Sequence, residues 1–389
     1  MVWKLSRTKK KSKAVLIVAI LTFLIAALAV VCFLINPLVI QPKKDAIAKA
    51  NADAKAAVEE RNRQAEAEYK ARIAELESQA KTPTNPSWPE HKSEGWDLLD
   101  LTNIPLENQT AETRTRAELM TGGMLLVNAF HSRPKDFDES GVVSVAKAYK
   151  GDDKIQAKDN NVTLFPNAID ALHEAIVAAK AEGLQHYLVE EGYRTYETQE
   201  TYFNNKVSKL SSKYTGQALL DAAMKEVNYP GTSEYNSGLA FELRLYDKND
   251  PEVSVPKYST TAEAKWMNEN CWQYGIVFRF PQAGWPLESS TDKSFKTGVS
   301  KKLNLYRYVG KGNAAIMHYM DFTMEEYIEY LEEHPHIALY VDDNLMYEVY
   351  RQPVGDAENI NVQLTHNAKS HESSLDNMGG VITVFNYQE

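Results

Sequence analysis

Apolar and polar residues divide the chain into segments of different character. Residues 14–35 form an apolar run with no charge and with Thr22 as its one polar interruption. At 1.5 Å per residue, a helix of this length crosses a hydrocarbon core of about 30 Å. The residues before it are rich in Lys and Arg, and such flanks stay in the cytoplasm. We therefore predict a cytoplasmic basic tail at 1–13, a transmembrane helix at 14–36 and an extracellular remainder. A cleaved signal peptide is the alternative, but its apolar region is typically shorter.

The next segment, residues 43–81, is rich in Ala, Glu, Lys, Arg and Gln and has no Gly or Pro, which favours a solvated helix. Its apolar positions fall roughly on one face: Ile47, Ala54, Val58, Ala65, Tyr69, Ile73, Leu76 and Ala80. Most are small or widely spaced, so a weak coiled coil and a single rigid stalk both remain open. Residues 82–96 contain three prolines and several turn formers and are predicted to be a linker.

The remaining pattern predicts a mixed domain. Helical spacing of apolar residues predicts helices at 167–182, 196–210, 261–274 and 323–332. Short apolar or β-branched runs predict strands at 186–194, 275–281 and 303–309. Because these elements do not alternate regularly, we expect an α+β domain over residues 97–333. Further β-branched and aromatic runs predict a small β-rich appendage at 334–389.

Charge and cysteine content exclude some classes of function. The net charge is −10, although the first 13 residues are basic, so the body of the chain is acidic. An acidic body argues against a nucleic-acid partner, which requires clustered Lys and Arg. With Cys32 in the apolar run, Cys271 has no partner for a disulfide in the outer domain. His334 and His336 flank a proline without a third ligand nearby, which is typical of a helix end.

Five blocks occur in a recognisable order: LLVNAFHSRPKDF (125–137), EEGYRTYETQ (190–199), PGTSEYNSGLAFEL (230–243), WMNENCWQYGIVFRFP (266–281) and LYRYVG (305–310). This order resembles the VanY-type D,D-carboxypeptidases, zinc peptidases that remove the terminal D-alanine from peptidoglycan stem peptides. The resemblance covers about residues 125–331. It implies a LAS-type carboxypeptidase domain, with a small central antiparallel sheet flanked by helices. The C-terminal appendage resembles, more weakly, one found attached to such domains.

The family holds its zinc with the pattern SxHxxGxAxD and a later ExxH that also supplies the catalytic base. Three residues of the first pattern are retained here: Ser233, Gly238 and Ala240. The four positions of the metal chemistry are occupied differently: Tyr235 stands at the histidine position, Glu242 at the aspartate, Lys302 at the base and Leu305 at the last ligand.

These substitutions argue against zinc chemistry. Glu242 keeps a carboxylate, but Leu305 has no ligand atom, and Tyr235, a phenol with a pKa near 10, is a poor substitute for imidazole. Lys302 cannot accept the proton of a metal-bound water and would repel the metal. We therefore expect no zinc cofactor and no standard carboxypeptidase activity. Lys302 and Glu242 could instead form an ion pair at the old site.

Four candidate peptide-binding residues are retained: Tyr193, Arg194, Gln199 and Ser233. The resemblance implies that Arg194 contacts substrate near the scissile carbonyl, a role that suits a fixed guanidinium, and that Ser233 helps to hold the peptide. The alternative is that these side chains only satisfy internal hydrogen bonds.

Three functions follow as expectations. The first is a membrane-anchored, non-catalytic relative that binds a stem peptide or an envelope partner. The second is an active D,D-carboxypeptidase with an atypical metal site. The third is a structural component of a membrane complex, with self-association through the stalk as a possible contact.

Overall fold

The computed structural model describes residues 20–23, 41–79 and 95–388, except for the side chains at 43, 62 and 65–79. The predicted basic tail, nearly all of the predicted transmembrane helix and most of the predicted linker lie outside these ranges. Residues 20–23 are helical. Among the helices of the described ranges, none combines the length and the apolar character that crossing a bilayer requires.

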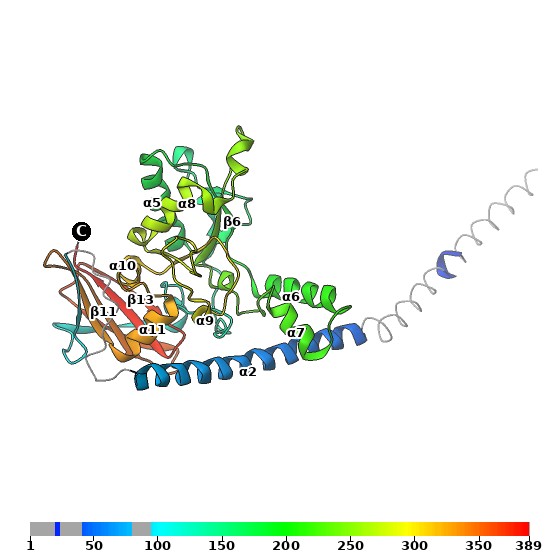
Figure 1. The fold of residues 1–389 in the computed structure, drawn as a ribbon, viewed down its shortest axis with the longest axis horizontal. Coiled ribbons are helices and arrows are strands. Elements are labelled where there is room, and N and C mark those ends of the chain that lie inside the picture. Colours follow the sequence, from blue (N-terminus) through cyan, green and yellow to red (C-terminus); the bar gives the residue numbers. More distant parts are fainter. Residues whose placement is uncertain (1–19, 24–40, 80–94, 389) are drawn as a thin grey trace, which may run out of the picture.

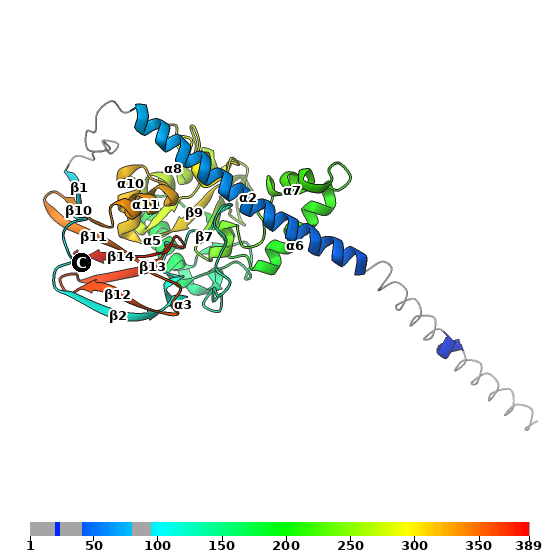
Figure 2. The ribbon, with the colours of Figure 1, turned by 90° about the horizontal axis from the view of Figure 1, so that it is seen from below.

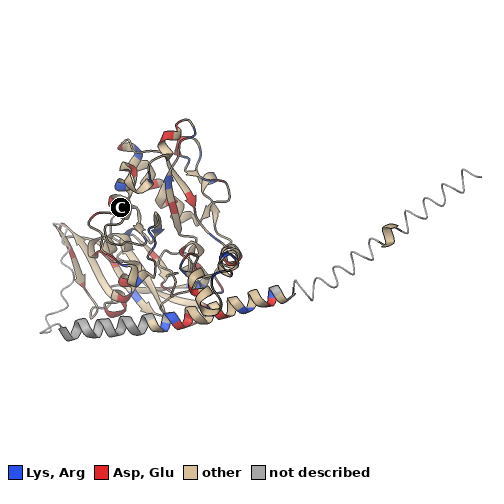
Figure 3. Cartoon of the chain, turned by 45° about the vertical axis from the view of Figure 1, so that its right-hand side comes forward, with Lys and Arg blue, Asp and Glu red and all other residues tan. Residues whose placement is uncertain are grey.

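The helix expected at 43–81 is present as α2, Gln41–Gln79. It lies along one side of the molecule, next to α6 (Tyr196–Leu210) and α7 (Gly216–Met224), in both views of the fold (Figures 1 and 2). Ala54 and Val58 are buried in one cluster with apolar residues of α6 and α7. Acidic and basic residues are interspersed along the coloured part of α2 (Figure 3), which is typical of a solvated helix face. The predicted apolar face therefore contacts the same chain over this part of the helix.

The central domain, residues 116–333, is built on a five-stranded sheet. The strand order is β4 (Gln156–Ala157), β6 (Tyr187–Glu191), β7 (Ala240–Leu245), β9 (Leu305–Tyr308) and β8 (Ile276–Phe278). Only the short β4–β6 pair is parallel, and the other pairs are antiparallel. Helices α5 (Pro166–Ala181) and α8 (Ala262–Asn270) share a buried core with the sheet. The small, mainly antiparallel sheet with flanking helices agrees with the predicted α+β domain.

The other elements of the central domain are short or lie toward its end. Helices are α3 (Arg116–Leu119), α4 (Val145–Ala148), α9 (Ser294–Thr297), α10 (Lys311–Met320) and α11 (Met324–Glu333). Strands β3 (Val143–Ser144) and β5 (Thr163–Leu164) pair with each other. Turns of 3-10 helix lie at Gly151–Asp153, Glu234–Ser237, Pro251–Ser254, Tyr258–Thr260 and Cys271–Tyr274.

A second sheet lies beside the central domain. Its strand order is β1 (Trp96–Asp100), β10 (His336–Val341), β11 (Asn344–Pro353), β14 (Gly380–Asn386) and β13 (Ser370–Leu375), all antiparallel. Strand β12 (Asn359–Thr365) pairs with β2 (Gln109–Thr115). We call β1, β2 and β10–β14 the β unit. The predicted appendage at 334–389 thus includes strands from residues 96–115, which the predicted boundary at residue 97 assigned to the central domain.

Helices α10 and α11 join the two parts of the molecule. Ile316 of α10 and Leu331 of α11 are buried in one cluster with Ile337 and Val349 of the β unit. Gly312 makes the close approach possible, because a Cβ at this position would meet Val384 and the ring of Tyr347 within 3 Å. The β unit is therefore packed tightly against the start of α10.

Candidate functional site

The positions aligned with the family's metal ligands meet in the folded chain. Tyr235 lies in the 3-10 turn before β7, Glu242 lies on β7, and Leu305 begins β9. Strands β7 and β9 are antiparallel neighbours, with Glu242 opposite Leu305. Tyr235 and Leu305 are buried in one apolar cluster with Ala240 and Phe280. Tyr235, Glu242 and Leu305, which the sequence motifs single out, therefore lie close together in the structure.

Tyr235 and Glu242 are bound to each other at this point. The Tyr235 hydroxyl donates a hydrogen bond of 2.9 Å to Glu242 Oε2. Burial raises the pKa of Tyr235 well above its usual value, so the phenol keeps its proton. Burial also raises the pKa of Glu242, and the nearby charge of Glu191 acts in the same direction. A metal ligand has to give up its proton, and burial acts against the charged form of both groups.

Lys302 does not join this pair. Its side chain is exposed, and Nζ lies 5.7 Å from the centroid of the Trp285 ring. Among the ion pairs of the described residues, none links Lys302 to Glu242. The expected ion pair is wrong because Lys302 lies in the loop before β9, where its ammonium group contacts an aromatic face.

These residues do not fit the zinc ion of the family. Within the described ranges, no three His, Cys, Asp or Glu side chains are grouped so that they could hold a metal. Leu305 has no donor atom, and Tyr235 is a protonated phenol. Glu191 lies opposite Glu242 on the neighbouring strand, but it is paired with Arg194. The carboxyl group of Glu242 alone does not make the three-ligand site that catalytic zinc requires.

Arg194 is stacked between two tyrosine rings beside the Tyr235–Glu242 pair. Its guanidinium carbon lies 4.4 Å from the ring centroid of Tyr235 and 4.9 Å from that of Tyr202. Its Nε donates to Glu191 Oε1 at 2.9 Å, and its Nη1 donates to Gln199 Oε1 at 2.7 Å. The tyrosine at the lost histidine position therefore fixes the arginine that the sequence assigned to peptide binding.

The other three candidate peptide-binding residues are held by internal contacts. Gln199 is fully buried, and its Nε2 donates to the carbonyl of Asn228 at 2.6 Å. Ser233 is buried and begins the 3-10 turn that carries Tyr235. The hydroxyl of Tyr193 donates to Glu139 and accepts a hydrogen bond from Arg133. Gln199 and Ser233 thus act as supports, while Tyr193 is half-buried and the Arg194 side chain keeps 12% of its surface exposed.

A buried ionic network under the site was not found from the sequence. Arg279 donates to Glu234 Oε2 at 2.8 Å and to Glu325 Oε1 at 2.7 Å, and Arg307 also pairs with Glu234. All four side chains are at most 5% exposed. Burial raises the pKa of Glu325, but Arg279 outweighs it and holds this pKa below its usual value. The visible signal was an arginine inside each of the apolar strands FRF and YRY.

This network fixes the turn on which the site is built. Glu234 directly precedes Tyr235, so its two arginine partners hold the 3-10 turn against β8 and β9. Arg307 also donates to the carbonyls of Gly123 and Leu125, at 2.7 and 3.0 Å. Removing one member of such a network is costly, because it leaves an uncompensated buried charge. The scaffold of the site is therefore rigid even though its metal chemistry is altered.

Comparison with known proteins identifies the relatives of this chain. The family model VanY, D-alanyl-D-alanine carboxypeptidase, matches residues 161–310, which include all four altered positions. A D-alanyl-D-alanine carboxypeptidase of Enterococcus faecium is 28% identical over 280 residues, which are 72% of this chain and 80% of the relative. The protein YodJ of Bacillus subtilis, described only provisionally as a carboxypeptidase, is 31% identical over 206 residues, 53% of this chain and 67% of its own.

The crystal structure of the vancomycin resistance D,D-dipeptidase VanXYg, in complex with a D-Ala-D-Ala phosphinate analogue, has a similar fold. Its TM-score is 0.54 at 20% sequence identity, and the match covers 72% of this chain and 99% of that chain. The fold, the ordered motifs and the family match agree with one another. This chain belongs to the VanY family of D-alanyl-D-alanine carboxypeptidases.

Proposed function

We propose that this chain is a membrane-anchored, extracytoplasmic VanY-family protein without carboxypeptidase activity, which binds a peptidoglycan stem peptide or an envelope partner through its remodelled cleft. The observation that supports this proposal most directly is the bond from Tyr235 to Glu242, with Leu305 opposite, at the position of the family's metal. This arrangement replaces a metal-ligand set by a hydrogen-bonded, partly apolar contact.

Two functions that the family's reaction needs, a zinc-bound water and a general base, are missing from these residues. Zinc lowers the pKa of its bound water to about 7 and so supplies the nucleophile, which the present donor set cannot support. The base position carries Lys302, whose ammonium group cannot accept a proton from water. Loss of general-base catalysis alone costs about 10²- to 10⁴-fold in rate. The two losses together argue against turnover.

Ligand binding is supported by features that the altered positions leave in place. Arg194 is fixed in the cleft by two aromatic rings and two hydrogen bonds. Tyr202 on α6 lies against it and is 46% exposed, and Tyr196 at the start of α6 is 38% exposed. Rigid tyrosine rings and a fixed arginine are the residue types that dominate peptide recognition. We infer that the ligand lies across α6 and the Arg194 stack.

The test uses the full chain purified in detergent and a stem pentapeptide. We expect no release of D-alanine, together with saturable binding of the peptide that Arg194→Ala weakens. Release of D-alanine that depends on added zinc would instead establish the alternative, an active D,D-carboxypeptidase with an atypical metal site. If the peptide does not bind and Arg194→Ala has no effect in cells, the cleft proposal is wrong.

The second alternative, a structural component of a membrane complex, draws on a different observation. Helix α2 lies along one side of the molecule and packs on α6 and α7 (Figure 2). This alternative predicts that deleting α2 abolishes function while Arg194→Ala leaves it unchanged. Comparison of these two variants in cells separates it from the cleft proposal.

Membrane anchoring through residues 14–36 is part of the proposal, with residues 1–13 in the cytoplasm. Its support is the uncharged apolar run and the basic residues before it. We expect the protein to stay in the membrane fraction at alkaline pH, and its globular part to be cleaved by protease added outside intact cells. Recovery in the soluble fraction, or protection from the protease, would contradict this topology.

A further inference from the structure

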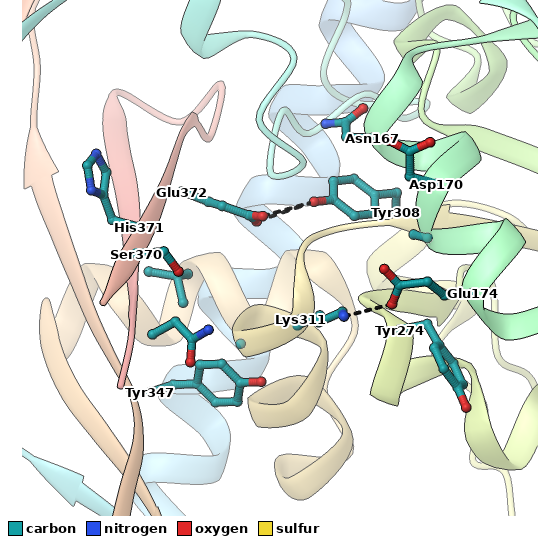
Figure 4. A pocket seen from close by; sticks show the side chains of 14 residues that line it. Asn167, Asp170, Glu174, Tyr274, Tyr308, Lys311, Tyr347, Ser370, His371 and Glu372 are labelled. Atoms are coloured by element: carbon teal, nitrogen blue, oxygen red, sulfur yellow. Dashed lines mark hydrogen bonds and ion pairs between the residues drawn. The ribbon is translucent and has the colours of Figure 1, made fainter. Parts of the chain in front are cut away.

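A cavity lies between the central domain and the β unit, at the start of α10. Its volume is 310 Å³, and α5, α10, β11, β13 and β14 contribute to its walls (Figure 4). Small-molecule sites have volumes of about 300–1,000 Å³ and often lie where domains meet. This cavity is separate from the cleft of Tyr235 and Arg194, none of whose residues line it.

The walls of the cavity carry more negative than positive charge. Asp170 and Glu174 come from α5, and Glu372 comes from β13 on the opposite side (Figure 4). The one lysine in the wall, Lys311, pairs with Glu174 at 2.7 Å. Asp170 accepts a hydrogen bond of 2.7 Å from the hydroxyl of Tyr149. Among the ion pairs of the described residues, none gives Asp170 or Glu372 a cationic partner.

Glu372, at an exposed position of β13, makes the longest contacts of the three carboxyl groups. Its bonds to the Tyr308 hydroxyl are long, at 3.3 and 3.4 Å. The surrounding protein raises the pKa of Glu372, against the opposing effects of Tyr308 and Lys311. Burial raises the pKa of Tyr308, and Glu372, Glu174 and Asp170 each raise it further. All three carboxyl groups line the cavity together with Tyr308, and Glu372 accepts a hydrogen bond from its hydroxyl.

The fold holds Glu372 in this position. Gly310 precedes α10 with φ +87°, and a Cβ there would lie 2.6 Å from Glu372 Oε2. The carboxylate therefore rests against the first turn of α10, where the helix dipole favours a negative charge. The ring of Tyr347 packs against Gly312, which also lies in the first turn of α10. The cavity is consequently a formed site with a fixed anionic group and aromatic walls, before any ligand enters.

We propose that this cavity binds a small organic molecule through a primary ammonium group, which Glu372 and Asp170 hold against the tyrosine-lined wall. An ammonium group supplies the missing cation, and aromatic faces add cation–π attraction. An anionic ligand is disfavoured, because Lys311 already pairs with Glu174 and the two other carboxylates would repel it. This inference does not depend on the proposed function of the cleft.

The same ammonium chemistry occurs on a lysine-type side chain and on an amino sugar, so the test uses two matched pairs of probes. Binding of Nα-acetyl-lysine amide is compared with that of its Nε-acetylated form, and binding of D-glucosamine with that of N-acetyl-D-glucosamine. Calorimetry on the full chain in detergent measures each one. The charged member of one pair is expected to bind roughly tenfold more tightly than its neutral partner, the effect of one charged hydrogen bond. Which pair responds identifies the source.

Variants locate the binding in this cavity. Glu372→Gln keeps an acceptor for the Tyr308 hydroxyl but removes the negative charge. Asp170→Asn, at an exposed position of α5, likewise keeps an acceptor oxygen and removes the charge. Each substitution should weaken binding of the charged probe roughly tenfold. Glu269→Gln, a surface position on α8, is the control and should leave affinity unchanged, as should Arg194→Ala in the cleft. If Glu372→Gln lowers the melting temperature, Asp170→Asn decides the result. Equal binding of charged and neutral probes, or full affinity in both cavity variants, would overturn the proposal.

Discussion

Tyr235 connects most features of the altered site. Its hydroxyl bonds to Glu242, its ring stacks on Arg194, and the same ring packs against Leu305. The histidine of the family would bring a metal ligand to this position, whereas the tyrosine brings a donor and an apolar surface. This substitution therefore puts a packed contact where the family has a metal ligand, and the other substitutions are consistent with it.

Tyr235→Phe tests the value of the hydroxyl. The substitution leaves a half-buried carboxyl group without its donor, so we expect the free energy of unfolding to fall by about 1–3 kcal/mol. Urea unfolding monitored by tryptophan fluorescence measures this change. Tyr246→Phe, at an exposed tyrosine, is the matched control and should have little effect. Equal stability of both variants would show that the bond to Glu242 contributes nothing.

His336 gives the β unit a predictable pH dependence. Its ring nitrogens lie 2.6 Å from Glu348 Oε1 and 2.6 Å from the carbonyl of Ile104. Burial opposes the charged form, but these partners outweigh it and raise the pKa of His336. A raised folded-state pKa means that the stabilisation is complete below the unfolded value of about 6.5 and is lost as the pH rises through the folded value.

The comparison is between the native chain and His336→Gln. We expect the difference in free energy of unfolding between the native chain and the variant to be larger near pH 5.5 than near pH 9, because the charged imidazole stabilises the folded state. Urea unfolding at each pH measures the margin. A margin that stays constant, or that widens toward alkaline pH, would show that the imidazole is not protonated preferentially in the folded state.

At the level of elements, α2 is the feature that most changes the view taken from the sequence. Its small apolar residues left both a coiled coil and a free stalk open, and the structure places Ala54 and Val58 against α6 and α7. The hydroxyl of Tyr229 donates to the carbonyl of Asn51 at 2.9 Å, and Asn51 Nδ2 donates to Glu200 at 3.2 Å. Small side chains are suited to this close helix packing as well as to a weak coiled coil.

Ala54→Asp tests this contact, with Ala56→Asp as its control on the same helix. Ala54 is fully buried, whereas Ala56 is exposed, so only the first substitution places an unpaired charge in an apolar interface. We expect faster amide hydrogen exchange in α6 and α7 for Ala54→Asp and native exchange for Ala56→Asp. Native exchange in both would mean that α2 does not pack on these helices in solution.

The sequence predicted most of the longer amphipathic helices, missed α7, and predicted the fully buried or exposed elements poorly. Helices α5, α6, α8 and α11 were found because each has an apolar stripe and a recognisable end. Helix α10, KGNAAIMHYM, was missed because it is buried on nearly all sides and has no single apolar face. Strands β1 and β2 were missed because they are largely exposed, so they show little alternation of apolar and polar residues.

In the candidate site, the sequence likewise predicted the residues within motifs and missed the contacts between distant segments. Ordered motifs brought Tyr235, Glu242 and Leu305 to one point, because spacing within a motif fixes local geometry. The pairing of Glu234 with Arg279 and Arg307 joins segments 45 and 73 residues apart, and no local pattern specifies such contacts. The same holds for Lys302, whose aromatic partner Trp285 lies in a separate loop.

For the whole molecule, the β unit is an integral part of the fold. Its strands come from both sides of the central domain in the sequence, and its core residues Ile337 and Val349 pack on α10 and α11. A chain that ends at residue 333 would leave β1 and β2 unpaired and would expose this shared core to water. The predicted boundary at residue 334 is therefore a poor place to divide the protein.

Truncation after residue 333 tests this arrangement. We expect the shortened chain to aggregate or to melt well below the full chain, because several buried apolar side chains at about 1.5–3 kcal/mol each would become exposed. Thermal unfolding followed by circular dichroism compares the two chains. A truncated chain that melts cooperatively at the native temperature would show that the β unit is an independent appendage.

The central claim is that a rigid VanY scaffold has lost its metal site through the residues at positions 235, 242, 302 and 305. The most direct measurement is the zinc content of the purified native chain, compared with that of the combined variant Tyr235→His, Glu242→Asp, Lys302→Glu, Leu305→His after identical dialysis. The account predicts no retained zinc in the native chain and about one ion per chain in the variant, which restores three ligands. One tightly held zinc ion in the native chain would contradict the account.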